Sequence, residues 1–107
     1  GAFYLLWYNQ LQSLGGFMAV TRTLNTIRIT ADNDTFTGVQ NICAINYVAG
    51  TSSPSAQIKV TNTSGALLFS ANGTVSDVYD VDLRCQADET YHVDLAGTGT
   101  ELILYVE

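Results

Sequence analysis

The side chains best suited to chemistry are His92 and Asp94. They lie two positions apart in the run Tyr91 to Leu95, where apolar residues occupy every second position. Residues two apart in a strand share a face, so the pattern predicts that both point away from the core. A carboxylate beside an imidazole can orient it as a general base. The sequence has no Gly-x-Ser-x-Gly motif to supply a nucleophile. We therefore expect a surface histidine, no catalytic residues and a protein that is not an enzyme.

Acidic residues are concentrated in one segment, since positions 77–94 hold six of the ten acids in the chain. Asp80 and Asp82 are predicted on one face of a strand, about 7 Å apart, with Asp77 in the preceding turn. Converging carboxylates supply the hard oxygen ligands that Ca²⁺ prefers, so these three residues are the candidate metal ligands. The simpler interpretation is the solvated face of an antiparallel strand, because the spacing of an EF-hand loop is absent.

Aromatic side chains offer a second kind of binding surface. Exposed rings in a row can form a platform for a sugar or a peptide, whereas inward rings belong to the core. A carbohydrate- or Ca²⁺-binding β module is therefore the alternative function. The residues concerned are Tyr4, Trp7, Tyr8, Tyr47, Tyr79, Tyr91 and Tyr105.

The charge balance excludes other partners. The formal net charge is −6, and an acidic surface repels nucleic acid and anionic membranes. No apolar run approaches the roughly 18 residues of a spanning helix, and residues 3–8 lack the basic flank of a signal peptide. We expect no nucleic-acid partner, no membrane association and no cofactor. The four cations are Arg22, Arg28, Lys59 and Arg84.

From residue 24 onward the hydrophobic period is two, which is typical of half-buried strands. Polar turn residues interrupt the pattern every eight to twelve positions, and residues 50–55 are predicted as a loop on composition. Short connections favour antiparallel pairing. We predict an all-β domain of six to seven strands, and the pattern fits a sandwich and a small barrel equally well.

The apolar phase of each run predicts the core. Cys43 and Cys85 both fall in this phase, where a free thiol packs as a small hydrophobe, and a bridge between them is the alternative. Residues 39–48 are apolar on both faces, which indicates a central or bent strand. The predicted core is Ile27, Ile29, Cys43, Ile45, Ile58, Val60, Val81, Leu83, Val93, Leu95, Leu102 and Leu104.

The chain divides into an apolar segment, 1–17, and one β domain, 18–107. Residues 1–21 carry no charge. Within them Phe3, Trp7, Leu11 and Leu14 recur at helical spacing, which predicts a short amphipathic helix over 3–14. Such a helix is marginal alone, so this stripe is the predicted interaction surface, on a neighbouring subunit or an open end of the domain. The alternative is a translation or cloning artefact.

From Met18, the sequence resembles small all-β proteins of tailed bacteriophages. The stretches that carry the resemblance are 30–35, Thr-Ala-Asp-Asn-Asp-Thr; 58–65, Ile-Lys-Val-Thr-Asn-Thr-Ser-Gly; and 97–102, Gly-Thr-Gly-Thr-Glu-Leu. It implies a virion or accessory protein, with no functional residue carried over. We therefore expect a non-catalytic structural or interaction module, partnered by its own copies or by other virion proteins.

Overall fold

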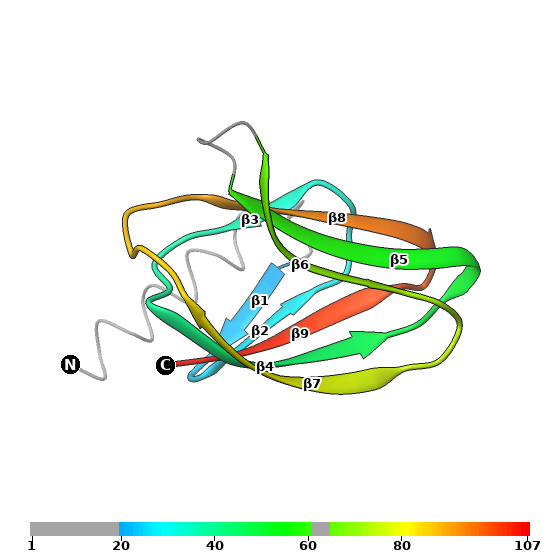
Figure 1. The fold of residues 1–107 in the computed structure, drawn as a ribbon, viewed down its shortest axis with the longest axis horizontal. Helices are drawn as coiled ribbons and strands as arrows, with labels where there is room; N and C mark the ends of the chain where they lie inside the picture. The colour runs from blue at the N-terminus through cyan, green and yellow to red at the C-terminus, as the bar shows by residue number, and fades with distance from the viewer. Residues whose placement is uncertain (1–19, 61–64) are drawn as a thin grey trace.

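Two antiparallel β-sheets pack face to face in the computed structural model, which describes residues 20–60 and 65–107. One sheet has the strand order β1-β2-β9-β4-β7 and the other β3-β8-β5-β6. Figure 1 shows β8 and β5 crossing above β9 and β4. The all-β prediction is confirmed, and of the two architectures left open the sandwich is the one that forms. The strands are β1 (Val20–Thr23), β2 (Thr26–Ile29), β3 (Asp34–Phe36), β4 (Asn41–Val48), β5 (Thr51–Val60), β6 (Ala66–Asn72), β7 (Asp77–Arg84), β8 (Tyr91–Thr98) and β9 (Glu101–Val106).

Nine strands form in the described residues, two more than the upper end of the prediction. The additional strands are β1 and β3, which are short and lie at sheet edges. β1 joins β2 through a two-residue turn in which Leu24 has a φ of 52°, a conformation that leucine rarely adopts. Residues 51–55, predicted as a loop, begin β5 instead, with Ser52 and Ser53 at positive φ where the register shifts.

The predicted core is confirmed at eight of its twelve positions, which are buried. Val60, Val81 and Leu83 are half-buried and pack against this core. These side chains point toward the core as predicted. They are less covered because Val60 is the last residue of β5, and Val81 and Leu83 lie on the edge strand β7. The eight are Ile27, Ile29, Ile45, Ile58, Val93, Leu95, Leu102 and Leu104.

Cys43 is the exception, and its predicted inward orientation is wrong. Where β4 pairs with β9, the register shifts between Ile42 and Ala44, which makes Cys43 the extra residue of a β-bulge. The register with β7 shifts at the same place, but there the extra residue lies on β7. Ile42 and Ile45 are therefore both fully buried, while Cys43 is half-buried and its thiol donates to the carbonyl of Tyr105. Cys43 and Cys85 are free thiols, so the alternative of a bridge does not form.

Two chain crossings between the sheets pack against each other at one end of the sandwich. The β4–β5 crossing contains Gly50, whose N–H donates to the buried hydroxyl of Thr100 in the β8–β9 crossing. A Cβ added to Gly50 would overlap the carbonyl oxygen of Thr98 and lie 2.6 Å from the nitrogen of Thr100. Only glycine permits this approach of two backbones.

The domain boundary predicted at residue 18 falls just before Val20, the first residue of β1. The predicted helix over 3–14, with Phe3, Trp7, Leu11 and Leu14, lies outside the described residues. Its interaction role stays a prediction.

Val81→Asp should lower the free energy of unfolding by about 1–3 kcal/mol, because it places a carboxylate against the core. Val78→Asp is the matched control on the same strand, since Val78 is 58% exposed. Urea unfolding of both variants measures the difference. Equal midpoints would contradict the orientation of β7.

Gly50→Ala should cost about 3 kcal/mol, because the new methyl group would meet backbone that cannot move independently. Gly73→Ala should cost only about 1 kcal/mol, from its positive φ, since nothing lies within 4 Å of an added Cβ there. Thermal unfolding compares the two. A smaller loss for Gly50→Ala would show that the crossings are not packed tightly.

Candidate functional site

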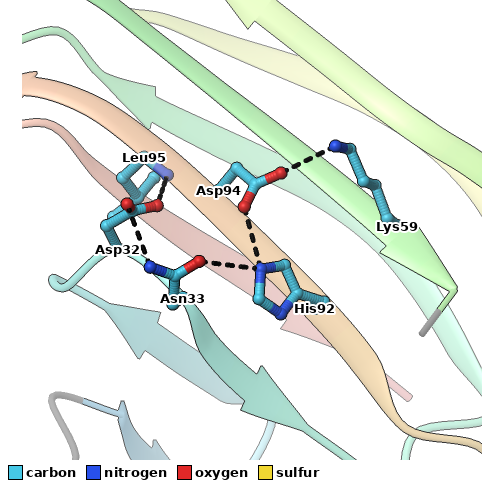
Figure 2. Close-up of polar contacts among 6 residues, drawn as sticks. All are labelled: Asp32, Asn33, Lys59, His92, Asp94 and Leu95. Carbon is cyan, nitrogen blue, oxygen red and sulfur yellow. Dashed lines mark hydrogen bonds and ion pairs between the residues drawn. The ribbon is translucent and has the colours of Figure 1, made fainter. Parts of the chain in front are cut away.

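A polar cluster on the outer face of the four-stranded sheet gathers His92 and Asp94 from β8, Lys59 from β5 and the turn before β3. Figure 2 shows Asp94 between His92 and Lys59. The Nε2 atom of His92 lies 2.8 Å from Oδ1 of Asp94, and Nζ of Lys59 lies 2.9 Å from Oδ2. The predicted His92–Asp94 pair is confirmed. The sequence pattern did not predict Lys59 in this cluster. Lys59 lies opposite His92 because β5 pairs with β8, and the pairing of strands is not visible in the sequence.

The turn of Asp32 and Asn33 completes the cluster. Asn33 adopts a left-handed φ of 68°, which asparagine tolerates, and its Oδ1 lies 3.1 Å from Nε2 of His92. Asp32 accepts a hydrogen bond from the backbone N–H of Leu95 at 2.8 Å. The backbone pairing of β3 with β8 ends at Asp34 and Val93. The side chains of Asp32 and Asn33 continue the contact with β8 past that pair. Their acceptor role follows the expected behaviour of short polar side chains.

The hydrogen bonds of the imidazole favour one tautomer. Nε2 of His92 faces two acceptors, Oδ1 of Asp94 and Oδ1 of Asn33, so this nitrogen carries the proton. In the neutral ring Nδ1 is then the acceptor, as in an oriented general base. Its described hydrogen-bond partners supply no hydroxyl or thiol nucleophile, and His92 lines neither of the two cavities described below. The geometry is that of a structural contact joining three segments.

Lys59 lowers the pKa of the Asp94 carboxyl. The hydrogen bond from its ammonium group holds the pKa of the Asp94 carboxyl below the usual range, with His92 acting in the same direction and partial burial opposing both. Side chains of Lys59 and Asp94 are each about one third exposed. Solvent therefore screens the pair, and its contribution to stability is below about 1 kcal/mol.

The acidic residues of β7 do not converge. Asp77, Asp80 and Asp82 are exposed, and Asp80 and Asp82 alternate with the inward residues Tyr79 and Val81. Within residues 20–60 and 65–107, no group of three His, Cys, Asp or Glu side chains is placed to hold a metal ion. The solvated-strand interpretation fits this arrangement.

The strand tyrosines do not make a platform. Tyr47 and Tyr91 are core residues, and the hydroxyl of Tyr47 donates to the carbonyl of Gly73 at 2.7 Å. Tyr79 is half-buried, and its ring packs edge-to-face on Phe69 at 5.4 Å. Tyr105, on β9 of the five-stranded sheet, is 38% exposed. Tyr4, Trp7 and Tyr8 lie outside the described residues.

Two cavities lie away from the polar cluster. A cavity of about 150 Å³ lies between the β1 and β3 edges, where Phe36 and Ile27 form its apolar wall and Arg22 its polar wall. A shallower one of about 450 Å³ lies at the β4 bulge, beside Cys43 and Asp82. Neither gathers residues with a shared catalytic chemistry.

Most of the partly buried apolar side chains lie on or next to β6 and β7, at one side of the sandwich. Eight hydrophobic residues in the described chain are partly buried against the core, and six of them belong to this side. We call them the β6–β7 side. They are Leu68, Phe69, Tyr79, Val81, Leu83 and Cys85.

The four sheet edges differ in composition. β1 and β3 have four and three residues, and β7 carries three aspartates and one arginine. Short strands and charged residues at an edge hinder pairing with another strand. β6 has seven residues, Ala-Leu-Leu-Phe-Ser-Ala-Asn, with no charge and no proline. It is the described edge strand without a charged side chain, and a bulge at Leu68 shifts its register with β5. Sequence reasoning missed it, because strand order is not visible in the sequence.

No protein-family model and no curated protein matches this sequence. Across the described residues, no helix has the length and apolar character needed to cross a membrane.

Because Lys59 lowers the pKa of Asp94, Lys59→Met should raise it toward its ordinary value of about 3.9. Arg28→Met is the charge-matched control, since Arg28 pairs with Glu101 on the other sheet. Carboxyl chemical shifts measured by NMR against pH give the midpoint of Asp94 directly.

The sign for stability follows from the lowered pKa. The contribution of Asp94 is present above its ordinary pKa and is lost as the pH falls through its folded-state pKa. An Asp94 midpoint unchanged in Lys59→Met would contradict the ion pair.

Proposed function

We propose that this protein is a non-catalytic structural or interaction module that acts as an oligomer. The observation that carries the proposal is the β6–β7 side, where six apolar side chains are left half-buried. Leu67, Val75 and Val78 on or between the same two strands are more than half exposed. Apolar surface gathered in one region of a small domain is typical of a contact with another protein.

The polar cluster supports the non-catalytic part of the proposal. The hydrogen bonds of His92 and Asp94 are directed at Asn33 and Lys59, which hold the cluster together across three segments. A catalytic imidazole needs a cavity that places a substrate beside it. The two described cavities lie elsewhere.

The N-terminal segment supports the oligomer from the sequence. Its predicted stripe of Phe3, Trp7, Leu11 and Leu14 needs an apolar partner to be stable. The setting that we propose, a bacteriophage virion, is supported by the resemblance of residues 18–107 to small phage proteins and by nothing else.

Sedimentation equilibrium of the full chain tests the proposal. We expect a mass that is a multiple of the 11.5 kDa chain and that falls on dilution. Trp7→Ser should weaken the assembly if the predicted stripe contributes, because it removes the largest apolar side chain of that stripe. Gln10→Ser, on the polar flank, is the control. A monomer mass at the highest soluble concentration would contradict the proposal.

A further inference from the structure

Building on the proposed oligomer, we propose that β6 is the assembly edge and that its partner is a second copy of this chain. The two β6 strands would pair antiparallel about a twofold axis. The four-stranded sheets of the two copies would then continue as one sheet.

The first argument is the hydrogen bonding of the backbone. Within residues 20–60 and 65–107, β6 pairs with β5 and has no partner on its other side. In an antiparallel edge strand, alternate residues direct their N–H and C=O groups away from the sheet. β6 has seven residues, with a bulge at Leu68 where its pairing with β5 shifts register, so a new ladder would form on residues 69–72. β3 has only three residues. A strand that pairs with its own copy is self-complementary under twofold symmetry.

The second argument is electrostatic. β5 and β6 together contain 17 residues (10 and 7) and a single charged side chain, Lys59. The whole chain has a net charge of −6, so two copies repel each other in most orientations. This half of the sheet carries no acid, so two β6 edges that meet bring no carboxylate of β5 or β6 close to another.

The third argument concerns the size of the partner. The β6–β7 side spans both layers, with Leu68 and Phe69 in one sheet and Tyr79 and Val81 in the other. Packed sheets lie about 10 Å apart, so a single added strand would cover one layer. A second sandwich presents the same two layers. It therefore fits the surface better than a peptide does.

The composition of β7 explains why we do not propose that the five-stranded sheets of the two copies join through β7. Asp80 and Asp82 share the exposed face of this edge strand. Antiparallel pairing of β7 with its own copy would place these carboxylates near their equivalents, which is unfavourable. The acids thus favour β6 as the pairing edge. They also predict that association strengthens as added salt screens the remaining repulsion.

Ser70→Lys tests the inference in the full chain. Ser70 is exposed and paired with Gln57 in the middle of the β5–β6 ladder, so a lysine there is accommodated in the monomer but faces its own copy in the pair. We expect the dissociation constant from sedimentation to rise about tenfold or more, since like charges across paired strands repel. Leu67→Lys, at a site 56% exposed on the same strand, should act in the same direction.

Leu24→Lys is the matched control. Leu24 is 69% exposed in the turn between β1 and β2, and the substitution adds the same single positive charge. Because the net charge becomes less negative, Leu24→Lys should leave association unchanged or slightly tighter, opposite to Ser70→Lys.

The outcomes separate the two proposals. A full chain that is monomeric at every concentration overturns both the oligomer and its β6 interface. A full chain that associates, with the same dissociation constant in Ser70→Lys, Leu67→Lys and wild type, overturns the β6 interface alone. A thermal melt of each variant identifies any loss of folding, and the second β6 variant then decides the result.

Discussion

Burial of one apolar layer between two sheets is the interaction on which the rest of the structure depends. Ile29, Ile45, Ile58 and Leu104 are completely buried in it, and the burial of these residues fixes which face of each strand points outward. His92 and Asp94 reach the outer surface for the same reason. The layer is well covered at the centre of both sheets and less well at β6 and β7. The proposed contact surface is therefore a consequence of where the core ends.

The fold class and the phase of most strands could be predicted, because alternation is a local property. Residues 79–85 and 91–95 show it without interruption, and His92 and Asp94 were placed correctly by it. Cys43 was misplaced because a β-bulge against β9 adds one residue to β4 and reverses its phase. Nothing in the run from Val39 to Val48 marks that position, since both of its faces are apolar.

The remaining features depend on which strands are neighbours, and this is not written in any single strand. Lys59 reaches Asp94 because β5 pairs with β8. Asn33 reaches His92 because the turn before β3 folds over the same face. The edge position of β6 likewise follows from the strand order. The acidic run on β7 was visible in the sequence. That this acidic strand lies on the same side of the sandwich as the uncharged edge strand β6 could be seen only in the three-dimensional structure.

Hydrogen exchange of the β6 backbone amides, followed by NMR in the full chain at two protein concentrations, tests the central claim most directly. Pairing with a second copy places outward N–H groups of β6 in new hydrogen bonds, so these amides should exchange more slowly at the higher concentration. The amides of β3, at the opposite edge of the same sheet, should exchange at the same rate in both samples. Exchange from β6 that is independent of concentration, in a sample that sedimentation shows to be associated, would contradict the account.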